Sequence, residues 1–203
     1  MSLIFLINKI KRVATRVVFR AVQLPRILAY RLLPSAKLLG RPTLYQPMQA
    51  TGLGVIEFKG TVKIGVHPSP FFFSSYAYIE ARNISASISI GHGSWINNNF
   101  CAIAEHSSIV IGERVLIGTG VEIYDSDFHG IRIPDRGRSD PSWARPVKIG
   151  SDVFLGSNVR VLKGVSIGDG SVIAGGSIVS KDIPSGVIAA GNPAKVVRSI
   201  LQI

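Results

Sequence analysis

Acidic residues are missing from the first quarter of the chain. No Asp or Glu precedes Glu57, whereas nine of the 23 Lys and Arg residues do. The rest of the chain carries 14 basic and 12 acidic side chains, so most of the net charge of +11 lies before Glu57. This split predicts a basic arm on a nearly neutral domain. It disfavours nucleic-acid binding, which needs basic residues across a folded face and aromatic residues for single strands.

Cysteine and long hydrophobic runs are also scarce. Cys101 is the single cysteine, which excludes an intramolecular disulfide framework and suits a reducing compartment. The apolar run at residues 3–7 is far too short to span a bilayer. It also lacks the preceding basic residue and the cleavage site of a signal peptide. We therefore expect a cytoplasmic protein.

A six-residue phrase repeats between Ile149 and Pro184. Two residue columns recur without exception, an aliphatic one and, three residues later, one of Asp, Asn or Gly. The aliphatic column is Ile149, Leu155, Val161, Ile167, Ile173 and Val179, and the second column is Asp152, Asn158, Gly164, Gly170, Gly176 and Asp182. A period of six rotates around a helix, but it keeps one face of a strand. The sequence therefore predicts short strands separated by bends, coiled as a parallel β-solenoid whose coils bury their apolar positions by stacking.

The segments outside the repeat divide the chain. Residues 1 to about 40 follow helical spacing, with Lys9, Arg12, Arg16 and Arg20 in one basic stripe and with Pro25 and Pro34 as expected breaks. We expect an amphipathic helical arm at residues 1–43 and a solenoid domain at 44–203, closed by a short helix after Pro193. Two interpretations of the arm stay open: contact with an anionic membrane surface, or packing on the solenoid or a neighbouring subunit.

Three interruptions break the register of the repeat. The first, at residues 66–76, contains three adjacent phenylalanines and is expected to cap the stack. The other two lie between Asn97 and Val110, where a segment is expected to leave the coil, and between Ile123 and Ile149. Insertions at particular coils of repeat proteins commonly carry the binding face, so these two are the candidate functional regions.

Several motifs resemble the hexapeptide-repeat acyltransferases. They are the repeat itself, the ending Ala190-Gly191-Asn192-Pro193-Ala194-Lys195, the segment Asn97-Asn98-Asn99-Phe100, the His129 loop and Arg145-Pro146-Val147-Lys148-Ile149-Gly150. The last three look like the maltose/galactoside O-acetyltransferase branch, which includes polysaccharide O-acetyltransferases. The resemblance implies an all-β protein with a left-handed parallel β-helix. It also implies a homotrimer that binds acetyl-coenzyme A in clefts between subunits.

The resemblance assigns roles at the reacting centre. His129 corresponds to the catalytic histidine, and an imidazole with a near-neutral pKa can take the proton of a sugar hydroxyl. Asp127, or with less support Asp125, is expected to orient that imidazole. Asn99 and Glu105 match positions used on the acceptor sugar. The Ser157 N–H is the candidate oxyanion donor.

The resemblance also assigns the coenzyme A contacts. Phe154 replaces a tryptophan of many relatives, and Ser157, Gly175 and Ser180 are expected along the pantetheine arm. The phosphates need positive charge, for which the candidates are Lys181, Lys195 and Arg198.

The predicted function is acetyl transfer from acetyl-coenzyme A to a hydroxyl of a cell-surface polysaccharide or its lipid-linked precursor. The expected mechanism is direct, with His129 as base and no metal. A peripheral position at the inner face of the cytoplasmic membrane is expected through residues 1–40. Two alternatives stay open: a non-catalytic trimeric scaffold, or a γ-type carbonic anhydrase, which needs three metal-binding histidines. The chain offers His67, His92, His106 and His129, without the close pair of that enzyme class.

Overall fold

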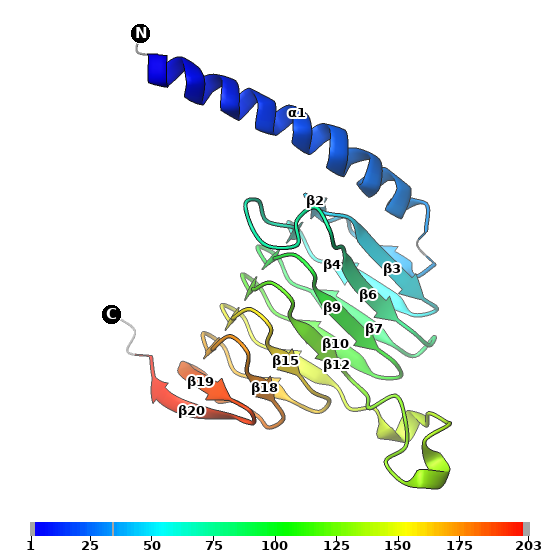
Figure 1. Ribbon diagram of the computed structural model, residues 1–203. Helices are drawn as coiled ribbons and strands as arrows, with labels where there is room; N and C mark the ends of the chain where they lie inside the picture. The colour runs from blue at the N-terminus through cyan, green and yellow to red at the C-terminus, as the bar shows by residue number, and fades with distance from the viewer. Residues whose placement is uncertain (1–2, 34, 201–203) are drawn as a thin grey trace.

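The computed structural model describes residues 3–33 and 35–200, and it shows one long helix lying across the end of a parallel β-helix (Figure 1). Each coil contributes a strand to each of three sheets, so the stack has three faces and three corners. Within these described ranges, all strand pairs are parallel except the last, β19 with β20. The solenoid predicted from the six-residue period is therefore present.

The three sheets are named A, B and C. Sheet A contains β1 (Lys37–Leu39), β4 (Val55–Phe58), β7 (Ser87–Ile90), β10 (Ser108–Ile111), β13 (Val147–Ile149) and β16 (Ser166–Ile167). Sheet B contains β2 (Thr43–Leu44), β5 (Lys63–Ile64), β8 (Trp95–Ile96), β11 (Leu116–Ile117), β14 (Phe154–Leu155), β17 (Val172–Ile173), β19 (Val187–Gly191) and β20 (Ala194–Ser199). Sheet C contains β3 (Met48–Gly52), β6 (Ala77–Ala81), β9 (Cys101–Ala104), β12 (Glu122–Tyr124), β15 (Arg160–Val161) and β18 (Ile178–Val179).

The two columns of the repeat occupy the places their chemistry favours. All six aliphatic residues of the first column are buried in the core between the sheets. In the second column, the backbone has a positive φ at Asp152 (59°), Asn158 (59°), Gly164, Gly170 and Gly176. Asn, Asp and Gly tolerate this left-handed conformation best, so the column marks the bends of the coil.

The coils in the middle of the stack are longer than those at its C-terminal end. Lys148 pairs with Ser166 one coil further on, whereas the coil that joins Ser87 to its partner Ser108 takes more of the chain. The segment between Asn97 and Val110 stays within the coil as β9 and the start of β10, because longer strands absorb the extra residues. The prediction that it leaves the coil is therefore wrong.

The interruption before β13 does leave the coil. Residues 125–146 form a loop that projects from the solenoid beyond β12 and carries two short 3₁₀ helices, η1 (Ile133–Asp135) and η2 (Pro141–Trp143) (Figure 1). This loop contains His129.

The N-terminal helix is longer and less divided than its prolines predict. Helix α1 (Leu3–Arg31) runs through Pro25 without a break, while Pro34 lies outside the described residues. The side chains of Lys9, Arg12, Arg16 and Arg20 also lie outside the part of the chain whose side chains are described. The first coil begins at Lys37, slightly before the expected boundary at residue 44. In the described ranges, α1 included, no helix has the length and apolarity needed to cross a membrane.

The C-terminal segment is a strand, and the prediction of a closing helix is wrong. β20 pairs antiparallel with β19 through a tight turn at Asn192 and Pro193. The valines of Lys195-Val196-Val197-Arg198 suit a strand, and the pairing covers the outer edge of sheet B.

Candidate active site

Most of the predicted site residues lie at two different corners of the solenoid, and the others lie on the strands of sheet B. The BC corner joins sheet B to sheet C and contains residues 97–100, 118–121, 156–159 and 174–177. The CA corner joins sheet C to sheet A and contains residues 105–107, 125–146, 162–165 and 180–182. His129, Asp127 and Glu105 belong to the CA corner, whereas Asn99, Ser157 and Gly175 belong to the BC corner.

His129 is exposed, and one of its ring nitrogens is occupied. Nδ1 lies 2.9 Å from the carbonyl oxygen of Arg136 on the far side of the same loop. A carbonyl can only accept, so Nδ1 donates to it, and in the neutral ring Nε2 is then the nitrogen that carries the lone pair. The loop therefore leaves Nε2 of the neutral tautomer available as a hydrogen-bond acceptor.

Asp127 does not orient His129, contrary to the prediction. Its carboxylate lies 2.6 Å from Lys163 Nζ, which also donates to the Trp143 carbonyl at 3.0 Å. Lys163 thereby ties the beginning of the loop to its end. The carbonyl of Arg136 takes the orienting place that the sequence assigned to a carboxylate.

Asp125 is excluded from that role as well. Its carboxylate is fully buried and accepts from the backbone N–H groups of Glu105 (2.7 Å), His106 (3.2 Å) and Ser107 (2.7 Å). These bonds hold the turn at residues 105–107 of the preceding coil against the start of the loop that contains His129. A carboxylate that fills its acceptor sites with backbone donors is a structural element.

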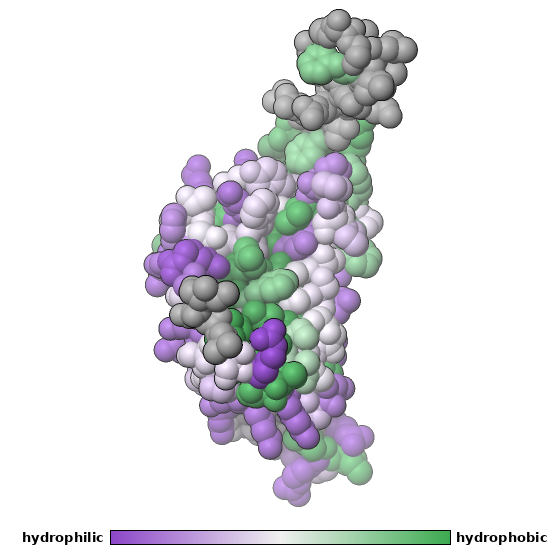
Figure 2. Space-filling view, turned by 90° about the vertical axis from the view of Figure 1, so that its left-hand side faces the viewer, coloured by the Kyte–Doolittle hydropathy of each residue, from purple (hydrophilic) through white to green (hydrophobic). Residues whose placement is uncertain are grey.

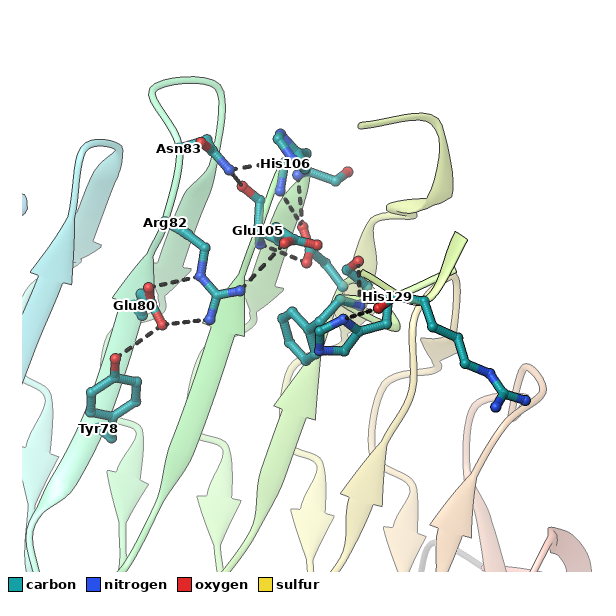
Figure 3. Close-up of polar contacts among 12 residues, drawn as sticks. Tyr78, Glu80, Arg82, Asn83, Glu105, His106 and His129 are labelled. Atoms are coloured by element: carbon teal, nitrogen blue, oxygen red, sulfur yellow. Dashed lines mark hydrogen bonds and ion pairs between the residues drawn. The ribbon is translucent and has the colours of Figure 1, made fainter. Parts of the chain in front are cut away.

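A polar network on sheet C leads toward the His129 loop (Figure 3). Glu80 accepts from Arg82 Nε at 2.9 Å and from the Tyr78 hydroxyl at 3.0 Å, and Arg82 Nη1 reaches Glu105 Oε1 at 3.3 Å. Burial and the bond to Glu80 raise the pKa of Tyr78 to about 12. Burial acts to raise the pKa of Glu80, but the bonds from Arg82 and Tyr78 bring it below its ordinary value.

Glu105 lies at the end of this network with one oxygen unused. Its side chain is buried, and in the described part of the chain Oε2 has no hydrogen-bond partner. A buried carboxylate oxygen without a donor is costly, and a role in binding or catalysis is one explanation for it. The guanidinium of Arg82 also stacks on Phe128, 4.9 Å from its ring centroid. Phe128 precedes His129 and has a φ of 63°, a strained value for an aromatic residue.

The BC corner is a stack of backbone turns. Hydrogen bonds connect successive coils from Gly120 N to Asn98 O (2.9 Å), from Asn158 N to Thr119 O (2.7 Å) and from Gly176 N to Ser157 O (2.8 Å). The Ser157 N–H meets no acceptor among residues 3–33 and 35–200. A Cβ at residue 118 would lie 2.6 Å from the Ser157 nitrogen, so the glycine leaves this N–H accessible.

Asn98 and Asn99 have different roles at this corner. Asn99 is exposed with a φ of 60° and forms the bend, as its place in the repeat predicts. Asn98 is fully buried, and its amide binds the loop at residues 66–76 through Val66 N (3.1 Å), Val66 O (3.0 Å) and Pro70 O (2.8 Å). The register of the repeat identifies Asn99 as the bend residue, whereas no local sequence signal indicates the contacts of Asn98.

An apolar hollow of about 220 Å³ lies beside the BC corner on the outer face of sheet B. Trp95, Leu116 and Phe154 stand in register on three successive strands and line it. All three are partly exposed, at 39%, 51% and 45%. Further along the same sheet, Lys195 and Arg198 project from β20 as exposed side chains. Ser180 and Lys181 lie apart from this track, at the CA corner of the last coil.

Comparisons with known proteins agree with this architecture. The sequence family described as "Hexapeptide repeat of succinyl-transferase" matches residues 146–181. Galactoside O-acetyltransferase of Escherichia coli (strain K12) is 31% identical over 178 residues, which cover 83% of this chain and 81% of that protein. The chain belongs to the hexapeptide-repeat acyltransferases.

Two further relatives show how much of the chain is similar to known acetyltransferases. The polySia-specific acetyltransferase NeuO superposes with a TM-score of 0.56 at 29% identity, covering 84% of this chain and 70% of that one. The Saccharomyces cerevisiae protein YJL218W is 42% identical over 117 residues, and the chain spans 58% of its length. The family thus extends over most of the solenoid of this acyltransferase.

The histidines of this acyltransferase are dispersed. His67 lies in the loop before β6, His92 lies between β7 and β8, and His106 lies at the CA corner. Within the residues that the structure describes, no three His, Cys, Asp or Glu side chains gather as a metal site requires.

Proposed function

We propose that this acyltransferase transfers an acetyl group from acetyl-coenzyme A to a hydroxyl of a glycan, with His129 as the general base. The observation that carries the proposal is the bond from His129 Nδ1 to the Arg136 carbonyl, which leaves Nε2 as the basic nitrogen of an exposed loop. A base placed on a projecting loop can meet a large acceptor. Galactoside and polySia appear in the names of two relatives, which supports a carbohydrate acceptor.

The chemistry is a direct transfer. The acceptor oxygen attacks the thioester carbonyl carbon while its proton passes to His129 Nε2. The carbonyl oxygen becomes an oxyanion that the Ser157 N–H is placed to stabilise. The C–S bond then breaks, and the imidazolium returns the proton to the departing sulfur, which yields the ester and coenzyme A.

Cys101 is a poor candidate for an acyl-enzyme. Burial is the main cause that raises the pKa of its thiol to about 11, so the reactive thiolate is scarce near neutral pH. Cys101 also lies in β9 on sheet C, outside both corners.

The donor would lie along sheet B. The hollow beside Phe154 suits the apolar part of a pantetheine arm, Ser157 and Gly175 offer backbone groups, and β20 offers Lys195 and Arg198 for phosphates. Asn99 and Glu105 remain candidates for the acceptor.

A single chain does not bring these parts together. In one coil the two corners are about six extended residues apart, on the order of 20 Å, whereas a reacting carbonyl must lie about 3 Å from both base and oxyanion donor. The His129 loop is held at its own corner by Lys163 and Arg82. We therefore propose a homotrimer of left-handed β-helices, in which the CA corner of one subunit faces the BC corner of the next.

The proposal is tested by following release of the coenzyme A thiol from acetyl-coenzyme A with galactosides, maltose and sialic acid polymers as acceptors. We expect release that depends on one class of acceptor, with ester formation of equal stoichiometry. Release that is unaffected by every glycan, or no binding of acetyl-coenzyme A, would contradict it.

A further inference from the structure

Helix α1 contacts the solenoid through one of its sides. Gln23 is fully buried and donates to the Phe72 carbonyl, and Arg26 donates to the Ser75 carbonyl at 2.8 Å. Phe19 stacks on Phe72 with ring centroids 5.3 Å apart, and Ile27 is buried on the same side. This side therefore binds the loop at residues 66–76 and fixes the helix across the end of the solenoid.

The opposite side of α1 is apolar and uncovered. Val17, Val18 and Leu28 are 60%, 52% and 50% exposed. With neighbours spaced by three or four residues they form a stripe, which we call the outer stripe: Ala14, Val17, Val18, Ala21, Pro25 and Leu28. At about 100° per residue, the centre of this stripe lies opposite the centre of the contact side.

The outer stripe extends over several turns of α1. Leu32, 86% exposed, continues it directly beyond the helix. Figure 2 shows the described part of the helix at the upper right, with hydrophobic residues open to solvent. Contiguous exposed apolar surface of this kind marks a contact with a partner or a membrane.

Charge identifies the partner. The outer stripe contains no charged residue, whereas the chain before Glu57 contains nine Lys and Arg residues and no acid. Membrane-surface helices combine an apolar face with surrounding cations that attract anionic lipids. A second copy of this chain offers no excess of negative charge, because its 12 acidic residues lie in a part of the chain that also carries 14 basic ones.

We propose that the outer stripe of α1 binds the surface of an anionic lipid bilayer and lies in the plane of its headgroups. The contact side of the helix then holds the solenoid to the membrane, with the β19–β20 hairpin at the end farthest from the lipid (Figure 1). This inference is independent of the acetyl-transfer proposal, because none of its residues belongs to either corner.

The test is flotation of the full chain with phosphatidylcholine vesicles, with and without about 30% phosphatidylglycerol, at two salt concentrations. We expect binding that requires phosphatidylglycerol and falls as salt rises. Leu28→Glu and Val18→Glu should each weaken it by on the order of tenfold or more. Leu28→Gln separates lost apolar contact from added charge and should weaken binding to a smaller extent.

Ile84→Glu is the matched control, because Ile84 is an 86% exposed aliphatic residue on the solenoid. It should bind vesicles as wild type does. Circular dichroism checks that every variant is folded. Equal binding to both vesicle types, or unchanged binding of Leu28→Glu and Val18→Glu, would overturn the proposal. It is also overturned if these variants lose oligomeric mass in the absence of lipid, which would assign the stripe to a contact between copies.

Discussion

At the scale of single residues, the carbonyl of Arg136 holds the His129 ring in place, and Lys163 holds the loop through Asp127. No carboxylate bonds to the His129 ring among the described residues. His129 and Asp127 are two residues apart, but they have separate partners, Arg136 and Lys163. Their substitutions should therefore have different consequences.

His129→Ala should lower kcat by on the order of 10²–10⁴ with the fold intact, because the exposed imidazole contributes to proton transfer and little to packing. Asp127→Asn should reduce kcat by no more than about tenfold, since it weakens only the exposed ion pair with Lys163. Steady-state kinetics on both variants, with circular dichroism as the fold control, checks this. If Asp127→Asn lowered kcat as much as His129→Ala does, the Asp127 carboxylate would have a role in catalysis.

Glu80 should make the folded state sensitive to acid. Its pKa in the folded protein is below the ordinary value of 4.5, so its ionised form stabilises the fold at neutral pH. That contribution is lost as pH falls from 4.5 through the lowered pKa. The free energy of unfolding of the wild type, measured with urea, should therefore decrease over this pH window. That of Glu80→Gln should decrease less. Parallel curves for the two proteins would show that the Tyr78–Glu80–Arg82 network does not contribute to the free energy of unfolding.

At the scale of elements, the bends of the coil determine which residues the repeat tolerates. Asn158 has a φ of 59°, where a β-branched residue is strained. Asn158→Val should lower the free energy of unfolding by roughly 1–2 kcal/mol, whereas Asn158→Gly should change it little. Thermal and urea denaturation measure both. Equal stability of the two variants would mean that the corner relaxes its backbone.

The β19–β20 hairpin should read the nucleotide end of coenzyme A. Lys195 and Arg198 are exposed on β20. Coenzyme A carries a 3′-phosphate that its dephospho form lacks, and this phosphate would form charge-assisted hydrogen bonds with the two side chains. Such bonds are worth roughly 1.5–3 kcal/mol, or about ten- to 150-fold in affinity. Lys195→Ala combined with Arg198→Ala should abolish the preference for coenzyme A over its dephospho form and keep affinity for the latter. Calorimetry that shows an equal loss for both forms would indicate a role in holding the hairpin.

The sequence predicts the regular elements better than the site. The repeat identifies the core residues and the positive-φ bends because each depends on a local requirement that recurs with every phrase of the repeat. It predicts a helix where the chain forms the C-terminal strand β20. This strand forms because β19 leaves a free edge at the end of sheet B, and the local sequence does not contain that information. The single helix through Pro25 depends on its packing against residues 66–76, which local propensity does not contain.

The site is harder to predict, because its parts come from coils far apart in the sequence. The alternation Tyr78, Glu80, Arg82 could have indicated a polar stripe on one face of a strand. Nothing local indicates that Lys163 reaches Asp127 from a later coil, or that the Arg136 carbonyl replaces a carboxylate. Asn98 likewise stands between two other asparagines, and nothing local indicates that its amide binds the loop at residues 66–76.

At the scale of the whole molecule, the proposed base His129 and the proposed oxyanion donor Ser157 lie at different corners of one chain. This separation is the reason for proposing that each active site belongs to two subunits. In the proposed trimer, a heterologous, ring-closing contact would pair the CA corner of every subunit with the BC corner of the next. Inactive subunits damaged at different corners should therefore restore activity when they assemble together.

The direct measurement is complementation between His129→Ala, which removes the base, and Ser157→Trp, which blocks the BC corner. Each variant alone should form inactive trimers. The two variants are mixed at equal concentration, unfolded and reassembled. Three quarters of the trimers then contain both variants, and each of these holds one intact site of its three. Activity should therefore return to about one quarter of wild type. Size-exclusion chromatography with light scattering confirms that the reassembled species has the mass of a trimer. Activity near one quarter is the predicted result, and a mixture that stays as inactive as its parents would contradict a site shared between subunits.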